Sequence, residues 1–202
     1  MTNLSWQLSA IALLLGYLLG SIPFGLIFTW AAGAGDVRKI GSGNIGATNV
    51  LRTGNRWAAA ATLLCDAGKG LAAVLIAKFY LGVDAALIAA IGAFAGHLFP
   101  VWLNFKGGKG GAAGLGILFG LSWLAGAGAA LTWLAAAAIW RISSLSTLIA
   151  AALAPLYLVM LQEFQFAALA TALAIALFAM HRANLRRLLA GTEPRIRVSG
   201  GS

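Results

Sequence analysis

Residues 41–52 of the chain read Gly41-Ser42-Gly43-Asn44-Ile45-Gly46-Ala47-Thr48-Asn49-Val50-Leu51-Arg52. We call this polar segment the glycine island, because it interrupts a chain that is otherwise nearly all apolar. Its glycines allow positive φ angles and a close approach of the backbone to a ligand. Hydroxyl and amide side chains add hydrogen-bonding groups, and Arg52 adds a permanent positive charge. Such groups are typical of an oxyanion site, so we predict phosphate binding here, with candidate contacts at Gly41, Gly43, Asn44, Gly46, Thr48 and Asn49.

The composition around the island is that of an integral membrane protein. The 202 residues are 61% hydrophobic and 9% charged, with a mean hydropathy of +0.90, whereas a soluble domain averages roughly 45–50% apolar and about 25% charged residues. No polar linker divides the chain, so we expect one all-α membrane domain over residues 1–202. The single Cys65 excludes an intramolecular disulfide. The net charge of +9 indicates cytoplasmic loops that face anionic lipid or phosphate, rather than a nucleic-acid partner.

Five long apolar segments flank the island. They are residues 7–31, 57–81, 85–103, 145–161 and 165–180, and about 20 apolar residues suffice for a helix to cross a bilayer. Pro23 is expected to kink the first of these spans. Asp66 and Lys69 lie three residues apart in the second span, where isolated charges are costly. We therefore predict an ion pair between them, which is either structural or supports an active site.

Residues 111–140 are almost wholly apolar, too long for one ordinary span and short for two. A single helix would put Arg141 and the tail arginines opposite the basic loop at 104–111. A turn near residues 120–123 or 126–128 instead puts all basic loops on one side, as the positive-inside rule favours. We therefore predict a polytopic protein with seven transmembrane helices, some of them short, an external N-terminus and a cytoplasmic C-terminus. In this topology 12 of the 14 Lys and Arg residues lie inside.

A second glycine-rich segment, which we call the glycine–lysine loop, covers residues 104–111 and reads Asn-Phe-Lys-Gly-Gly-Lys-Gly-Gly. Its flexible N–H groups surround the ammonium groups of Lys106 and Lys109, a combination that suits phosphate. The G-x-x-x-x-G-K-[ST] spacing of a Walker A motif is absent, so nucleotide hydrolysis is not indicated. The candidate backbone contacts are those of Gly107, Gly108 and Gly110.

The predicted topology gathers the polar segments at one membrane face. They are the island, the glycine–lysine loop, Arg141 with the serines that follow it, and the tail that begins at His181. A transporter would more often concentrate polar groups at mid-membrane between internal repeats, and the sequence shows no convincing repeat. An interfacial enzyme that joins a soluble phosphorylated molecule to a lipid-like one needs this arrangement.

The island and three further motifs resemble the bacterial acyl-phosphate:glycerol-3-phosphate acyltransferases. The further motifs are Asp66-x-x-Lys69-Gly70, Gly96-His97-x-Phe99-Pro100 through Gly107-Gly108-Lys109-Gly110, and His181-Arg182-x-Asn184-Leu185 with Glu193. The resemblance covers nearly the whole chain. It implies a multi-pass enzyme of the bacterial inner membrane that works at the cytoplasmic face without a cofactor. The implied reaction transfers a fatty acyl group from acyl phosphate to the 1-hydroxyl of glycerol 3-phosphate, and gives lysophosphatidic acid and phosphate for phospholipid synthesis. An upstream enzyme that forms acyl phosphate is an expected partner.

The resemblance also implies roles for individual residues. It puts Ser42, Arg52 and Lys109 near phosphate and His181 and Asn184 in the substrate site. The weaker and supporting candidates are Ser146, Asp66, Lys69, His97 and Glu193. One departure is Ala113, which lacks the hydroxyl of the threonine that the family usually has at this point. Three groups stay open as acceptors of the proton from the attacking hydroxyl: His181, His97 and a substrate phosphate oxygen.

Other interpretations are weaker. A small transporter or channel for an anionic solute would use the glycine loops as a filter, and its support is Asp66, Lys69 and Lys78 on one span. Snorkelling to the outer interface explains Lys78 better. No cluster of His, Cys, Asp and Glu indicates a metal site. Arg186 and Arg187 are expected to meet anionic lipid headgroups, with Glu193 as a pairing partner for a tail arginine.

Overall fold

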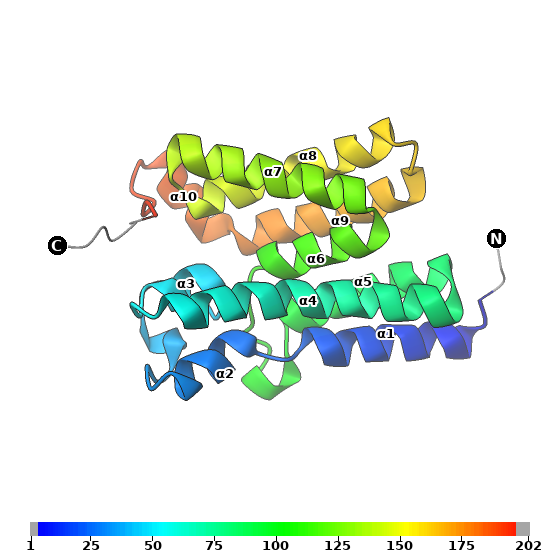
Figure 1. The fold of residues 1–202 in the computed structure, drawn as a ribbon, viewed down its shortest axis with the longest axis horizontal. Helices are drawn as coiled ribbons and strands as arrows, with labels where there is room; N and C mark the ends of the chain where they lie inside the picture. The colour runs from blue at the N-terminus through cyan, green and yellow to red at the C-terminus, as the bar shows by residue number, and fades with distance from the viewer. Residues whose placement is uncertain (1–3, 197–202) are drawn as a thin grey trace. The chain divides into compact units, whose positions relative to one another are not determined.

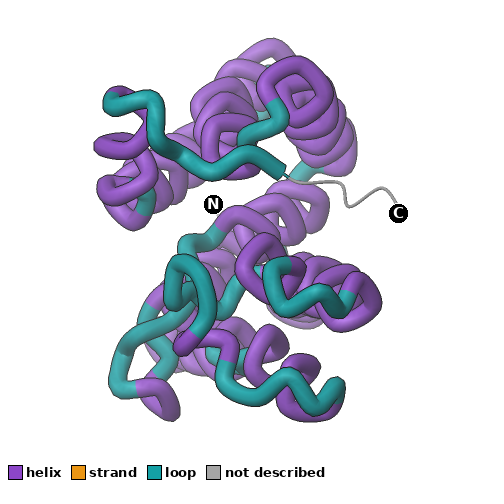
Figure 2. Tube along the Cα trace, turned by 90° about the vertical axis from the view of Figure 1, so that its left-hand side faces the viewer, coloured by secondary structure: helices purple, strands orange, loops and turns teal. Residues whose placement is uncertain are grey.

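The computed structural model describes residues 4–196, and every regular element in this range is a helix (Figures 1 and 2). The described chain contains ten α-helices and two short 3-10 helices, with these bounds: α1 Trp6–Gly20, α2 Phe24–Ala31, η1 Val37–Lys39, α3 Ala47–Leu51, α4 Arg56–Leu81, α5 Val83–Leu98, η2 Val101–Leu103, α6 Gly111–Leu121, α7 Trp123–Trp140, α8 Ser143–Met160, α9 Phe164–Met180 and α10 Arg182–Leu189. The expected orientation of the chain ends concerns residues 1–3 and 197–202, which lie outside this range.

The helices group into two compact units, Met1–Gly126 and Ala127–Ser202, which we call unit 1 and unit 2. Unit 1 holds α1 to α6 with the island and the glycine–lysine loop. Helix α7 begins in unit 1 and continues into unit 2, which also holds α8 to α10. That both units belong to one membrane domain stays a prediction.

The apolar helices confirm the class of a polytopic membrane protein. Five segments of the described chain are long and apolar enough to cross a bilayer: 6–31, 56–81, 83–103, 123–140 and 143–160. A sixth arises if α9 and α10, bent by 66°, count as one broken span. Helix α6 has 11 residues and is therefore about 16 Å long, roughly half the thickness of the hydrocarbon core. The seventh span of the predicted topology depends on this short helix and stays a prediction.

The first span is broken where Pro23 predicted a kink. Helix α1 ends at Gly20 and α2 begins at Phe24, so residues 21–23 leave the helical conformation. Proline removes a backbone donor and clashes with the preceding turn, which explains the break. The carbonyl of Ile22 is thereby released from a helical hydrogen bond and accepts one from the side chain of Lys69 at 2.8 Å.

Unit 1 is held together by helices that meet through glycine. Helix α1 packs beside α5 (Figure 1), and a Cβ added to Gly16 or Gly20 would overlap the backbone of Ala89 or Ala93. In the reverse direction, a Cβ on Gly92 would overlap the backbone of α1. Small residues allow such close backbone approach in a membrane. The seam between α1 and α5 therefore has no space for a methyl group at these positions.

Helix α6 packs on α4 in the same manner. A Cβ on Gly116 would overlap the backbone of Ala67, and one on Gly70 would overlap the backbone of Ala113. Ala113, the residue that departs from the family pattern, is fully buried. At the far end of α6, the Lys78 ammonium lies 3.5 Å from the Leu121 carbonyl. A positive charge there complements the helix dipole, so Lys78 supports the end of α6, and its reach to the outer interface stays a prediction.

The chain reverses at Ser122, between α6 and α7. A Cβ on Gly126 would lie 2.9 Å from the Cα of Phe119, whereas seven residues of continuous helix would separate these positions by about 10 Å. The predicted break within residues 111–140 is therefore confirmed, at the first of its two expected positions.

In unit 2, α8 packs against α9 and is joined to α7 by side-chain hydrogen bonds. The Trp133 indole donates to Thr147 Oγ1 at 3.0 Å, and the hydroxyls of Thr132 and Tyr157 lie 2.5 Å apart. The chain bends at His181 into the amphipathic helix α10, whose last turn carries Arg186 and Arg187. This bend brings the polar tail against the start of α8, as the contacts of Glu193 described below establish.

Candidate functional site

The glycine island is organised around the buried side chain of Asn49. Its Nδ2 group lies 2.8–2.9 Å from the carbonyls of Val37, Ile40 and Asn44, and its Oδ1 accepts the Ser42 N–H at 3.0 Å. Asn49 is 3% exposed, and the amide thus uses both its donor and its acceptor inside the island. We infer that it positions the island backbone and contributes little to a ligand directly.

The Arg52 side chain lies across the glycine turn at the start of the island. Gly41 and Gly43 have φ angles of +54° and +70°, which glycine adopts without strain. A Cβ on Gly41 would come within 2.7 Å of Arg52 Nη1 and 2.8 Å of Arg52 Cδ. Ser42, Thr48 and Arg52 are exposed, whereas Asn44 is half-buried and accepts the Gly46 N–H at 2.9 Å. The island therefore presents two hydroxyls and a guanidinium on a folded backbone.

A local ion pair fixes the segment that precedes the island. Asp36 accepts the Arg38 backbone N–H at 2.9 Å and pairs with the Arg38 guanidinium at 2.7 Å. The side-chain hydrogen bond from Arg38, followed by the backbone one, lowers the pKa of Asp36 to about 2. The same carboxylate raises the pKa of Arg38. Sequence reasoning missed this pair, although an Asp directly before a helical turn is a helix-capping signal.

A small apolar cluster joins the island to the glycine–lysine loop within unit 1. It consists of Leu26, Val37, Ile45, Val50, Ala58 and Ala59, with Phe28 and Leu103 packed against it. Val37, Ile45 and Val50 come from the island and its approach, whereas Leu103 directly precedes the glycine–lysine loop. Ser42 and Arg52 thus lie on a segment that packs on this cluster, and Lys109 lies on the loop that follows Leu103.

The glycine–lysine loop folds back onto the end of α5. The N–H groups of Gly107 and Gly108 donate to the carbonyls of Leu98 and His97 at 3.0 and 2.9 Å. Gly110 has a φ of +90° and forms the N-cap of α6. Lys109, between these glycines, is half-buried, whereas Lys106 is exposed. The backbone of the loop is consequently held against α5, and Lys109 is the less exposed of its two cations.

The predicted ion pair between Asp66 and Lys69 is confirmed. The Lys69 ammonium lies 2.7 Å from Asp66 Oδ1, and both side chains are 3% exposed. Lys69 also donates to the Ile22 carbonyl at 2.8 Å and lies 5.7 Å from the centre of the Phe24 ring. The His97 ring is equally buried, with its Nδ1 3.8 Å from Asp66 Oδ1. These three charged or titratable side chains form one group behind the glycine–lysine loop.

In unit 2, Glu193 is the centre of a polar network. Its carboxylate accepts hydrogen bonds from Ser144 at 2.7 Å, Asn184 at 2.5 Å and Arg187 at 2.6 Å. Burial raises the pKa of Glu193, but the three hydrogen bonds and the charge of Arg187 outweigh it and lower the pKa below the ordinary value. The expected pairing of Glu193 with a tail arginine is confirmed. The partnership with Ser144, which connects α8 to the tail, was not predicted.

His181 and Ser146 are both buried in unit 2 and bonded to helical carbonyls. His181 Nδ1 lies 2.9 Å from the Leu177 carbonyl. A carbonyl only accepts, so Nδ1 carries a proton, and in the neutral ring Nε2 is left as the acceptor. The Ser146 hydroxyl donates to the Ile142 carbonyl at 2.9 Å, and the residue is 0% exposed. The Ser146 hydroxyl is thus bonded to the backbone of its own helix.

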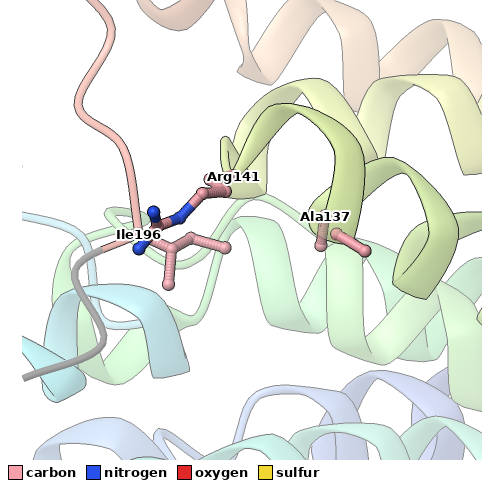
Figure 3. Close-up of a pocket in the computed structure, with 4 residues that line it drawn as sticks. Ala137, Arg141 and Ile196 are labelled. Atoms are coloured by element: carbon pink, nitrogen blue, oxygen red, sulfur yellow. The ribbon is translucent and has the colours of Figure 1, made fainter. Parts of the chain in front are cut away.

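A groove of about 270 Å³ lies on unit 2 beside the tail (Figure 3). Its lining residues are Ala137, Ala138, Arg141 and Ile196. The Ile196 N–H donates to the Arg141 carbonyl at 2.6 Å, which ties the tail to the end of α7. None of the sequence-predicted site residues lines this groove, and its walls are mainly apolar.

The predicted site residues therefore fall into two sets. Unit 1 carries the phosphate-binding candidates, and unit 2 carries the proposed histidine and asparagine with their carboxylate support. Among the described residues, no group of three or more His, Cys, Asp or Glu side chains could hold a metal ion. The candidate side chains in the two sets offer hydrogen-bonding groups, fixed positive charge and the imidazoles of His97 and His181.

The family model and the related proteins that match this chain all carry the same family name. Residues 10–191 match the family model of glycerol-3-phosphate acyltransferase. The chain is 60% identical over 182 residues to a glycerol-3-phosphate acyltransferase of Cereibacter sphaeroides (strain ATCC 17025), covering 90% of this chain and 87% of the relative. It is 58% identical over 199 residues to the Agrobacterium fabrum enzyme of the same name, covering 96% and 97% of the two chains.

Two solved structures are also similar. Both are crystal structures of PlsY (YgiH), an integral membrane glycerol 3-phosphate acyltransferase. The glycerol 3-phosphate form matches with a TM-score of 0.87 and 34% identity, covering 93% of this chain and 94% of the other. The lysophosphatidic acid form matches with a TM-score of 0.85 and 33% identity over the same shares.

Proposed function

Because this chain belongs to the glycerol-3-phosphate acyltransferase family, we propose that it transfers a fatty acyl group from acyl phosphate to the 1-hydroxyl of glycerol 3-phosphate. The products are lysophosphatidic acid and inorganic phosphate, and the reaction serves bacterial phospholipid synthesis. Family membership makes the chain an acyltransferase of glycerol 3-phosphate. The acyl phosphate donor and the residue roles below are our proposals.

The observation that carries this proposal is the shared support of the island and the glycine–lysine loop. Leu103, which directly precedes the glycine–lysine loop, packs on the same apolar cluster as Val37 and Val50, which belong to the island and its approach. Both proposed substrates carry a phosphate group, and a site for them must neutralise several negative charges. Two segments that carry hydroxyl groups and the cations of Arg52 and Lys109 meet that requirement. The related PlsY structures, in glycerol 3-phosphate and lysophosphatidic acid forms, support the same substrate and product.

The proposed step is a direct acyl transfer. The 1-hydroxyl oxygen attacks the carbonyl carbon of acyl phosphate, a new ester C–O bond forms, and the bond to the phosphate oxygen breaks. The hydroxyl proton leaves to a base, and the electron pair of the broken bond departs with phosphate. An acyl phosphate is already activated, so positioning and electrostatic stabilisation suffice, and no protein nucleophile is needed.

We assign phosphate binding to the side chains of Ser42, Arg52 and Lys109, together with the backbone N–H groups of Gly41 and Gly110. The N–H groups of Gly43, Gly46, Gly107 and Gly108 donate to acceptors within the protein, so the contacts expected at these four glycines from the sequence are not part of this assignment. Charge-assisted hydrogen bonds of this kind contribute roughly 1.5–3 kcal/mol each. Asn49 acts by positioning, since its amide is used within the island. The remaining island candidates, Asn44 and Thr48, are proposed to bind substrate through their polar side chains.

We assign proton handling to His181 and substrate orientation to Asn184. The bond from His181 Nδ1 to the Leu177 carbonyl fixes the ring and leaves Nε2 as the basic nitrogen. Glu193 holds the Asn184 amide at 2.5 Å and thereby sets its orientation. A substrate phosphate oxygen is the alternative proton acceptor, and His97 is excluded from this role in our proposal because its buried ring packs behind the loop.

The acyl phosphate donor is supported by the size of the non-helical segments. The segment between α2 and α4 in the described chain, residues 32–55, contains only the short helices η1 and α3 and is folded into the island and its approach. It does not form a domain able to cradle a nucleotide handle such as that of CoA. An acyl phosphate presents only a chain, which the bilayer can deliver, and a phosphate, which the glycine segments can bind.

The membrane placement follows from the charge distribution. We propose a protein of the bacterial inner membrane with seven helices, an external N-terminus, and a cytoplasmic C-terminus and active site. The support is the bias of basic residues toward loops on one side, which the positive-inside rule assigns to the cytoplasm. Acyl phosphate would then come from an enzyme that makes it on the same side.

The test is an assay of purified protein with glycerol 3-phosphate and either acyl phosphate or acyl-CoA. We expect phosphate release and lysophosphatidic acid in equal amounts with acyl phosphate alone. Turnover with acyl-CoA but not with acyl phosphate would show that the donor assignment is wrong. No turnover with either donor would favour the alternative interpretation, an anion transporter, over an acyltransferase.

A further inference from the structure

Lys109 is bracketed by two glycines that lie in contact with α5. A Cβ on Gly108 would overlap the imidazole Nε2 of His97 and lie 2.7 Å from its Cε1, and one on Gly110 would lie 2.5 Å from the Phe94 ring. Phe94 and His97 are three residues apart and therefore share one helix face. The lysine thus projects from a backbone that rests on two aromatic rings, with no space for a methyl group on either side.

The neighbouring Gly107 is equally confined. Its Cβ would overlap the His97 carbonyl and lie 2.5 Å from Pro100 Cδ. The Gly108 N–H donates to that same carbonyl at 2.9 Å. His97 therefore contacts the glycine–lysine loop twice, through its backbone carbonyl and through its ring. A change in the angle of the ring must move the loop, because no gap separates them.

Asp66 and Lys69 are the charged groups nearest the His97 ring. Asp66 Oδ1 lies 3.8 Å from His97 Nδ1 and 2.7 Å from the Lys69 ammonium. Lys69 is in turn held by the Ile22 carbonyl, at the break between α1 and α2. Burying an ion pair within a membrane span is costly. A packing role alone could be filled by apolar side chains, so this cost is explained if the pair has a positioning task.

We propose that Asp66, Lys69 and His97 form a positioning assembly that sets the height and direction of Lys109 for binding a substrate phosphate. The inference rests on the proposed function, which assigns Lys109 to phosphate binding. Asp66 Oδ1, at 3.8 Å from His97 Nδ1, is not hydrogen-bonded to the ring and acts on its angle through the electrostatic field of the buried carboxylate. The ring supports Gly108, and Gly108 places the ammonium group of the next residue. None of the three side chains touches substrate in this arrangement. They are positioning residues.

A double-mutant cycle between residues 97 and 108 tests the proposal. Gly108→Ala inserts a methyl group where the ring stands, so it should raise the KM for a phosphate substrate about 10- to 100-fold and change kcat by less than about threefold. In a His97→Ala background the ring is gone, so the added methyl group should raise KM by less than about threefold. Equal KM effects of Gly108→Ala in the two backgrounds would overturn the proposal.

The matched control is Gly114→Ala, in α6 directly after the loop. The nearest atom to its new methyl group is Phe94 Cε2 at 3.4 Å, an ordinary contact. Its KM and its melting temperature in detergent should match the wild type. His97→Asn serves as a second background. It also removes the ring but keeps a polar group at residue 97, so the cycle can be completed if His97→Ala does not fold.

Asp66→Asn tests the charged part of the assembly. Loss of the carboxylate charge should raise KM in the same direction as His97→Ala, while kcat changes less than KM. An unchanged KM in Asp66→Asn would remove Asp66 from the assembly. If the wild type turns over no acyl phosphate, the proposed reaction fails, and the cycle is then read from the rise in melting temperature that glycerol 3-phosphate produces. If neither KM nor the rise in melting temperature shows coupling between residues 97 and 108, the positioning proposal is wrong, whereas the proposed reaction is not affected by that result.

Discussion

The side chain of Arg52 lies across Gly41 so closely that a Cβ on residue 41 would come within 2.7 Å of the Arg52 Nη1 atom. The absence of a side chain at residue 41 therefore determines where the guanidinium of Arg52 can lie. Asn49 Oδ1 borders the same space, at 2.5 Å from that Cβ position. The island thus uses a glycine to define the position of its cation.

Gly41→Ala should lower kcat/KM by about tenfold or more, because the methyl group displaces Arg52 and strains a residue with a φ of +54°. Gly35→Ala is the control for strain alone. Gly35 has a φ of +71°, and nothing lies within 4 Å of its Cβ position. It should lose about 1–2 kcal/mol of stability and keep its activity. Equal activity of the two variants would show that the position of Arg52 is unimportant.

Arg52→Ala and Lys109→Ala should each remove one charge-assisted phosphate contact. A contact of roughly 1.5–3 kcal/mol corresponds to about a 10- to 150-fold loss in kcat/KM. The measurement is steady-state kinetics with acyl phosphate and glycerol 3-phosphate. Arg186→Ala, which removes an exposed tail charge, is the control and should lose much less. Similar losses in all three variants would mean that bulk positive charge, and not a defined site, binds the substrates.

Arg187→Ala should lower activity more than Arg186→Ala, although both arginines are expected from the sequence to meet lipid headgroups. Arg187 pairs with Glu193 at 2.6 Å, and Glu193 also holds Asn184. Loss of Arg187 should therefore lower kcat/KM through Asn184, and the loss should be smaller than that of Asn184→Ala. If both arginine variants keep full activity, the Glu193 network does not position Asn184.

The Glu193 network should make stability depend on pH below the ordinary pKa of a glutamate. The folded-state pKa of Glu193 lies below its ordinary value of 4.5. Its contribution to stability is therefore complete above that value and is lost as the pH falls through the folded-state pKa. Glu193→Gln should melt at a lower temperature than the wild type at neutral pH, and the two melting temperatures should converge in acid. A constant difference across this range would contradict the assignment.

The predicted topology can be tested by cysteine labelling in a Cys65→Ala background. Cysteines at residues 42 and 109 should react only with reagent that reaches the cytoplasm. Cysteines at Val83 and Gln162 should react from outside. External labelling at residue 109 would show that the hairpin at Ser122 does not return the chain to the side that we propose.

The sequence predicted the features that follow from local chemistry. The first span is broken at Pro23, as predicted. Asp66 and Lys69 form the predicted ion pair, because opposite charges three residues apart in a helix have few other partners in a membrane. The turn in residues 111–140 was predicted from the side on which basic residues must lie. It occurs at Ser122, between the 11-residue α6 and the 18-residue α7, which together are too long for one ordinary span.

The features that were missed depend on tertiary contact. Nothing in the sequence distinguishes Asn49, which holds the island backbone, from Asn44, which is half-buried. The contact of Gly108 with His97 requires the loop to fold back on α5, and glycine in a loop is compatible with many such paths. Ser144 and Glu193 are 49 residues apart in the chain, so their hydrogen bond carries no local signal.

The shortness of α6 has a consequence for the lipid around the protein. Gly116 of α6 meets Ala67 of α4, so residues 56–66 of α4 extend past this contact toward the island, by about 16 Å. Gly120 meets Val74, so α6 runs in the same direction as α4, and its first residue, Gly111, lies about 8 Å from the Gly116 contact. The end of the glycine–lysine loop therefore lies about 9 Å deeper than Arg56, at the start of α4. A thicker bilayer would bury this loop under more hydrocarbon, and a thinner one would bring it nearer to water. We expect the turnover rate in reconstituted vesicles to fall as lipid acyl chains are lengthened, which makes bilayer thickness a physical control on this enzyme.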